Sequence, residues 1–211
     1  MPIEDRATPI SAEDYLRAFQ VAHSVASTST RNVAKACAIF ALAGVEILKV
    51  HYGLDARRIA GAAFYHLHDR TGLGLGRIEG SAVSSSESAF HCWILCEDVV
   101  IDLVAPIFRE MLADAGHRSS VPRKMFQRHI DTMAPSIDDV TSEGDFHYAP
   151  NPELTAALSA REKPASGDLA SICAHWFVRA PQPLMPSLTM QDDRGELTEI
   201  RLSRISTTGR W

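Results

Sequence analysis

The 211-residue sequence has no run of basic residues and no long apolar stretch, and both absences narrow its possible functions. It carries 21 lysines and arginines against 26 aspartates and glutamates, which leaves a net charge of −5. Without a basic cluster to neutralise phosphates, we expect neither nucleic acid nor a membrane surface as a partner. No window approaches the roughly 18 apolar residues of a membrane span, and no leader-like segment follows Met1. We therefore expect a cytoplasmic protein.

Cysteine is scarce, and this bears on disulfides and metals. The four cysteines do not form a C-x-x-C pair, and they are too few for a disulfide framework, so we expect reduced thiols. Cys92 and Cys96 lie too far apart along one strand to share an ion easily, so no metal site is expected. The glycines from Gly72 to Gly76 do not have the spacing of a dinucleotide fingerprint. We expect no cofactor.

The hydrophobic pattern predicts helices and strands in one domain spanning residues 1–211. Ser11 is a capping residue for an amphipathic helix over 12–25, and 32–50 reads as an almost wholly enclosed helix that ends at Gly53. A strand is expected at 57–67, where Gly61 indicates close backbone packing. Residues 69–88, rich in glycine and serine, predict a mobile loop, and we expect the stretch from Gly72 to Ser86 to border the site as a lid. Further elements are expected within 106–112, 121–134, 152–162, 166–178 and 197–205.

Two apolar runs, 90–96 and 99–104, flank Glu97 and Asp98 and predict an antiparallel hairpin. If Cys96 lies opposite Val99 across a tight turn, His91 and Asp102 become diagonal neighbours on one face. Such neighbours are about 7–8 Å apart at Cα, a distance that an imidazole and a carboxylate can bridge. Asp102 stands in an apolar strand, where a carboxylate is costly to bury without a partner. The pattern therefore predicts a hydrogen-bonded His91–Asp102 pair.

Cys37, in the second helix, completes a nucleophile, base and orienting group in that chain order. Near the start of a helix, the dipole would favour its thiolate. Asn32 is a candidate donor to the oxyanion of an acyl-transfer intermediate, and Trp93 a candidate substrate contact. Each residue also has an ordinary reading. A single cysteine on an apolar helix is usually a small core residue, and Trp93 is most simply a core aromatic.

These residues resemble the core of transglutaminase-like proteins. The resemblance covers residues 30–106: Cys37 in an apolar helix, Gly53-Leu54-Asp55-Ala56-Arg57 leading into a strand, then His91-Cys92-Trp93 and Ile101-Asp102. It implies the α+β fold of papain-like cysteine proteinases, with the cysteine-bearing central helix packed on an antiparallel sheet. The chain is also similar to a small bacterial family of unknown function grouped with these proteinases by fold. Ala38 departs from the pattern, because many relatives have an aromatic residue there.

The leading hypothesis is cysteine-dependent acyl transfer or amide hydrolysis through a thioester, with a Cys37–His91–Asp102 triad and a small-molecule or peptide acyl substrate. The first alternative is a non-catalytic binding module on the same fold, with a pocket near Trp93. The second is a metal-dependent hydrolase that uses His66, His68 and His91.

Overall fold

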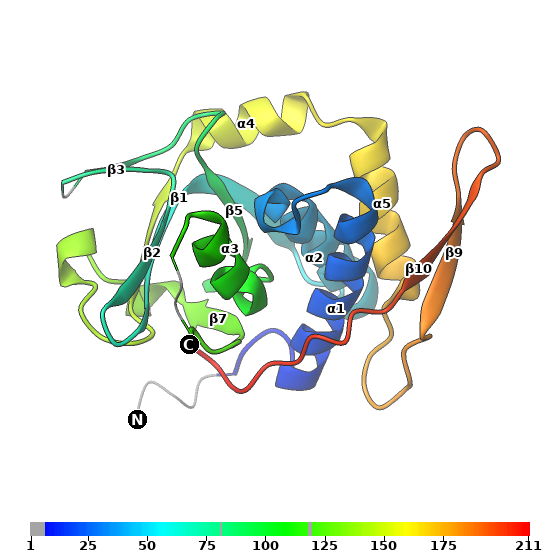
Figure 1. Ribbon diagram of the computed structural model, residues 1–211, viewed down its shortest axis with the longest axis horizontal. Coiled ribbons are helices and arrows are strands. Elements are labelled where there is room, and N and C mark those ends of the chain that lie inside the picture. Colours follow the sequence, from blue (N-terminus) through cyan, green and yellow to red (C-terminus); the bar gives the residue numbers. More distant parts are fainter. Residues whose placement is uncertain (1–6, 81, 118–119) are drawn as a thin grey trace.

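The computed structural model describes residues 7–80, 82–117 and 120–211, which form a mixed α+β fold around a curled antiparallel sheet. Figure 1 shows the helices α1 (Ala12–Ser29), α2 (Cys37–Tyr52) and α5 (Pro164–Trp176) grouped beside that sheet. Helix α2 packs against α1 and α5 and against the sheet. The expected arrangement of a central cysteine-bearing helix on an antiparallel sheet is therefore present.

Helix α1 begins where the sequence predicts but runs four residues further. The Ser11 hydroxyl caps it by accepting a hydrogen bond from the Asp14 amide at 3.1 Å. Three of the four added residues are serine or threonine, and their hydroxyls bond back to carbonyls of the same helix. Ser27 donates to His23 O at 2.7 Å and Thr28 to Val25 O at 2.8 Å. These bonds let serine and threonine continue the helix.

Helix α2 starts at Cys37, five residues later than predicted. Asn32 caps a separate 3₁₀ turn, η2 (Val33–Lys35), by accepting from the Ala34 amide. The helix ends as expected at Gly53, whose φ of 64° is the left-handed conformation that glycine adopts most readily. The later start places Cys37 on the first turn of the helix.

The central strand is β1 (Ala56–His68), which pairs with three other strands. Its first half pairs with β5 (His91–Cys96), and its second half pairs with β2 (Thr71–Leu75) and β8 (Phe146–Pro150). β5 continues through β6 (Val99–Asp102) to β7 (Phe126–His129). The Phe126 ring of β7 lies 5.0 Å from that of Phe146 in β8, so the sheet curls until the side chains of these two strands are in contact.

The segment 69–88 is not the loop that its composition predicts. It contains β2 and the small hairpin of β3 (Arg77–Glu79) and β4 (Ala82–Ser84). A Cβ on Gly74 would lie 2.1 Å from Ile78 Cδ1, and one on Gly72 would lie 3.0 Å from Phe64. Here glycine makes room for neighbouring side chains rather than for a flexible turn. Ser81 lies outside the described residues, and the lid hypothesis stays a prediction.

The remaining elements are η3 (Ala105–Ile107), α3 (Phe108–Asp114), η4 (Ile130–Thr132), η5 (Ile137–Asp139), α4 (Pro152–Ala160), β9 (Ser187–Gln191) and β10 (Leu197–Arg201). Helix α4 contacts β1, and β10 contacts α1. Asn151 caps α4, the element expected within 152–162, by accepting a hydrogen bond from the Leu154 amide at 2.9 Å, while β8 and β9 were not expected. The β9–β10 ribbon stands out from the rest of the molecule in Figure 1. No helix in the described ranges is both long and apolar enough to cross a membrane.

Gly61 occupies the crowded point of β1 where β5 and β8 both begin or end, as its sequence position indicated. A Cβ there would lie 2.2 Å from Ala149 O and 2.9 Å from Pro150 Cα, both backbone atoms. Gly61→Ala should therefore lower the free energy of unfolding in urea by roughly 1–3 kcal/mol. Gly167→Ala on α5 is the matched control, because nothing lies within 4 Å of its new Cβ. It should be neutral or stabilising by up to about 1 kcal/mol. Equal effects of the two substitutions would contradict this account.

Candidate active site

The β5–β6 hairpin brings His91 and Asp102 together. Cys96 pairs with Val99 and Ile94 with Ile101, the register that the even turn predicted. Glu97 completes the turn with a positive φ of 53°. His91 Nε2 and Asp102 Oδ2 are 2.7 Å apart, and the two side chains are 1 % and 0 % exposed. The predicted contact on a common face is confirmed.

The buried Asp102 carboxylate has a partner for each oxygen. Oδ2 receives hydrogen bonds from His91 and from the Tyr65 hydroxyl, the latter at 2.5 Å. Oδ1 accepts from the Val104 amide at 2.9 Å. Tyr148 bonds the Tyr65 hydroxyl at 2.8 Å, and Tyr15 donates to the Asp102 carbonyl. This network fixes the carboxylate, so Asp102 holds the His91 ring in one orientation.

Cys37 lies beside this pair, on the first turn of α2. The residue is 6 % exposed, and the side chains of Cys92 and His91 lie close enough to its thiol to shift its pKa. Because His91 Nε2 is bonded to Asp102, Nδ1 is the ring nitrogen available to the thiol. Ala36, the N-cap residue, makes no side-chain cap, so no side chain at that position occupies the first N–H groups of the helix. Those groups favour an anion at Cys37.

The electrostatics favour a thiolate and an imidazolium. The hydrogen bond with Cys92 lowers the pKa of Cys37 well below its usual value; burial opposes this, and His91 adds to the lowering. Burial lowers the pKa of His91, but Asp102 and Cys37 favour the protonated ring and raise it to about 10. Donation to Cys37 raises the pKa of Cys92, which therefore stays protonated. The arrangement therefore favours the thiolate form of Cys37.

Sequence reasoning missed three members of this network: Cys92, Tyr65 and Tyr148. Cys92 and His91 are adjacent in β5 and point to opposite faces of the strand, and Cys37 lies where it is close to both side chains. The tyrosines come from β1 and β8, and β8 was not expected. The alternating pattern of β1 marks Tyr65 as buried but gives no sign of its partner. Only the pairing of Tyr65 with Phe146 and of Ala63 with Tyr148 brings the two hydroxyls together.

Trp93 and Asn32, the other two predicted site residues, differ in position. The Trp93 ring stacks near His91, at 6.4 Å between centroids, and against Tyr148 at 4.4 Å. Asn32 is engaged elsewhere: its oxygen accepts from Ala34 N at 3.0 Å and its amide donates to Asp114. Its role as the cap of η2 explains this orientation. The structure thus brings Trp93 to the cluster of Cys37, His91 and Asp102, but it does not bring the Asn32 carboxamide there.

His66 and His68, two of the histidines of the metal-hydrolase alternative, bond to different partners. His66 Nε2 bonds Asp69 O at 2.6 Å, and His68 Nδ1 bonds Glu143 at 3.0 Å, which raises the pKa of His68. Across residues 7–80, 82–117 and 120–211, no three His, Cys, Asp or Glu side chains gather as a metal site requires. The ligand geometry therefore does not favour this alternative.

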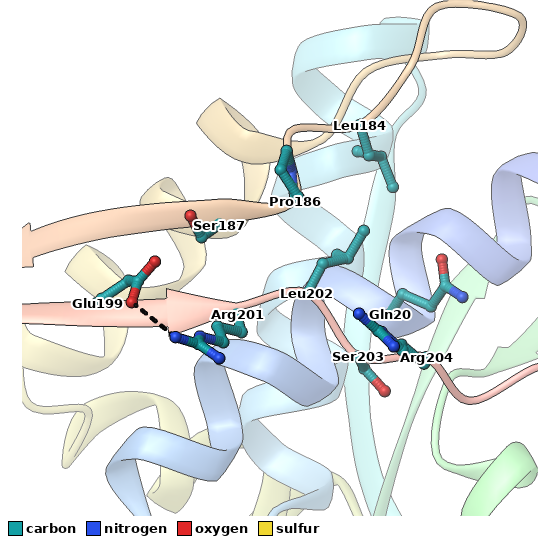
Figure 2. A pocket seen from close by; sticks show the side chains of 9 residues that line it. All are labelled: Gln20, Leu184, Pro186, Ser187, Glu199, Arg201, Leu202, Ser203 and Arg204. Carbon is teal, nitrogen blue, oxygen red and sulfur yellow. Dashed lines mark ion pairs between the residues drawn. The ribbon is translucent and has the colours of Figure 1, made fainter.

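Two hollows differ in their relation to the cluster. One, of about 850 Å³, lies between α1 and the β9–β10 ribbon and is lined by residues such as Gln20, Ser187 and Arg204 (Figure 2). Its dashed ion pair joins Glu199 and Arg201 at 3.5 Å. None of the triad residues lines it. A second cavity, of about 500 Å³, is lined by Trp93 and Tyr148, which both contact the cluster.

Together these features define an α+β protein with a buried, hydrogen-bonded cysteine, histidine and aspartate at a helix–sheet boundary. The chain belongs to a family described as "Protein of unknown function (DUF2026)", whose model matches residues 11–211. It is similar to a solved structure described as "The crystal structure of genomics APC5867", with 33% identity and a TM-score of 0.87. That likeness covers 99% of this chain and 100% of the other. No curated protein matches the chain.

The first prediction from this site concerns Cys92. Cys92→Ala removes the thiol that donates to Cys37 and should raise the pKa of Cys37. The measurement is the rate of iodoacetamide modification of Cys37 against pH, followed by peptide mass spectrometry. Cys96→Ala is the control. Cys96 is also buried and lies on the same face of β5, but it is four residues away from Cys92 along the strand. Coinciding pH profiles for the two variants would refute the role of Cys92.

The second prediction concerns Asp102. Asp102→Asn removes the negative charge beside His91 and should lower the pKa of His91 below its value of about 10. The measurement is an NMR titration of the His91 ring. Folding raises this pKa from 6.5, so the protonated ring stabilises the fold fully below pH 6.5 and loses that contribution as the pH rises through about 10.

The control for this titration is Asp98→Asn, which removes a turn carboxylate that bonds the His129 ring at 3.3 Å. It should leave the His91 titration unchanged. If Asp102→Asn also left it unchanged, the electrostatic account of the pair would fail.

Proposed function

We propose that this protein is an enzyme that transfers or hydrolyses acyl groups through a thioester on Cys37. The observation that carries the proposal is the buried His91–Asp102 hydrogen bond with Cys37 beside it, on the first turn of α2 and with a pKa that Cys92 and His91 lower. A papain-like arrangement is the finer interpretation of the fold. The packing of α2 on an antiparallel sheet that carries His91 supports it, as does the resemblance to transglutaminase-like proteins.

In the first step the Cys37 thiolate attacks the carbonyl carbon of an amide or other acyl donor. The C–S bond forms and the carbonyl oxygen takes the negative charge, next to the first N–H groups of α2. These N–H groups replace Asn32 as the proposed donors. As the intermediate collapses, His91 gives its proton to the leaving group and the thioester remains.

In the second step water or an amine resolves the thioester. His91, now neutral, takes a proton from the attacking group, and the thiolate leaves as the new acyl bond forms. Asp102 contacts no reacting atom. Its bond to His91 Nε2 keeps Nδ1 toward the thiol, and Tyr65 and Val104 keep the carboxylate in place.

One observation favours the second candidate, a non-catalytic binding module. Cys37 and His91 are 6 % and 1 % exposed, so a substrate has little access to them in this conformation. In such a module Cys37 would act as a small core residue and the cavity beside Trp93 would be the functional feature.

Electrophilic acyl probes distinguish the two candidates. Wild-type protein should form a covalent acyl adduct at Cys37, seen by intact-mass and peptide mass spectrometry, and Cys37→Ala should form none. His91→Ala should slow the adduct at least about a hundredfold, the usual minimum for loss of an acid–base group. Cys173→Ala is the control, because burial raises the pKa of that thiol to about 12 and it should play no part. Equal, slow modification of all four cysteines would favour the binding module.

A further inference from the structure

The cavity of about 500 Å³ opens on the same face of the sheet as His91. Gly61 pairs with His91, Ile59 with Trp93 and Arg57 with Leu95, so these side-chain positions share one face. Val100 and Asp102 lie on that face in the next strand. The cavity lining includes Ile59, Trp93, Leu95 and Val100. The cavity therefore extends from the His91 end of β5 toward its Leu95 end.

Its walls are mostly apolar. Ile130 and Met133 follow β7, and Pro150, Pro152 and Ala156 come from β8 and α4. The polar groups of the lining are largely engaged: the Thr155 hydroxyl bonds the Ala60 backbone, and the Tyr148 hydroxyl bonds Tyr65. A volume of this size is typical of small-molecule sites. The walls favour an aliphatic or aromatic group.

The two arginines of the lining, Arg57 and Arg58, differ in whether a carboxylate of the chain pairs with them. Arg58 is paired with Glu162 at 3.1 Å and bonds Ser159. Arg57 is exposed, and within the described ranges of the chain it has no ion pair. It lies four residues along β1 from Gly61, the partner of His91, which at about 3.3 Å per residue is a separation of about 13 Å. A cationic group thus stands at the end of the cavity distant from His91.

From this arrangement we infer that the cavity binds the apolar chain of the acyl donor and that Arg57 binds a carboxylate at its far end. The substrate class is an amide or ester of a straight-chain dicarboxylic acid, with the reacting carbonyl at Cys37. The assignment rests on the proposed thioester chemistry. An arginine suits this role because its planar fork matches a carboxylate in two parallel hydrogen bonds. Trp93 lines the cavity and its ring stacks on His91 at 6.4 Å between centroids, so the chain of the acyl donor would pass this ring to reach Cys37.

The binding experiment uses the full chain with Cys37→Ala and compares decanoate with uncharged decanamide by calorimetry. Decanoate should bind more tightly. Arg57→Ala should weaken decanoate about tenfold and leave decanamide unchanged, since a charge-assisted pair contributes about 1.4 kcal/mol or more. Ala156→Trp should abolish binding of both, because exposed Ala156 lines the cavity. Ala160→Trp, at an exposed position of the same helix outside the lining, should have no effect.

A second measurement tests the link to Cys37. Wild-type protein should be acylated by the mono-p-nitrophenyl ester of sebacic acid, and Arg57→Ala should lower that rate about tenfold while leaving iodoacetamide modification of Cys37 unchanged. Acylation with no effect of Arg57→Ala or Ala156→Trp would overturn the inference and leave the proposed function intact. Binding of decanoate as expected, without any acylation of Cys37, would overturn the proposed function and with it the assignment of the cavity to an acyl donor.

Discussion

A buried carboxylate is the constraint on which the rest of the site depends. Asp102 is inaccessible to solvent, and an unpaired charge there would cost several kcal/mol. Three donors from three parts of the chain meet it: His91 on β5, Tyr65 on β1 and the Val104 amide beyond β6. Satisfying Asp102 thus requires β1, β5 and β6 to be in register, and the same register fixes the orientation of His91. Stability and the geometry of the site are coupled through this one group.

The two faces of β5 pack against different parts of the molecule, and Cys37 lies near the first residues of both. On one face Ile94 packs so closely on α2 that a Cβ on Gly44 would lie 2.2 Å from its Cδ1. On the other face the rings of Trp93 and Tyr148 stack beside His91. Cys37, on the first turn of α2, contacts the adjacent side chains Cys92 and His91. The close approach at Gly44 therefore helps to set the distance between the nucleophile and its base.

Local signals predicted the parts of the site that depend on neighbouring residues. The even turn at Glu97 and Asp98 predicted the His91–Asp102 register, and Ser11 and Gly53 marked helix ends correctly. The failures arose where tertiary contacts decided the outcome. The glycines of β2 make room for Phe64 and Ile78. From composition alone, the same glycines predict a loop. Tyr65 and Tyr148 meet only through the pairing of β1 with β8, which lies some eighty residues away in the sequence.

The central claim is that the fold keeps Cys37 ionised beside a protonated His91. The most direct test is the ultraviolet absorbance of the thiolate, followed as the pH is lowered, in wild-type protein and in Cys37→Ala. The account predicts a thiolate signal in the wild type that persists well below the ordinary cysteine pKa of about 8.5 and is missing from Cys37→Ala. Identical titration curves for the two proteins would contradict it.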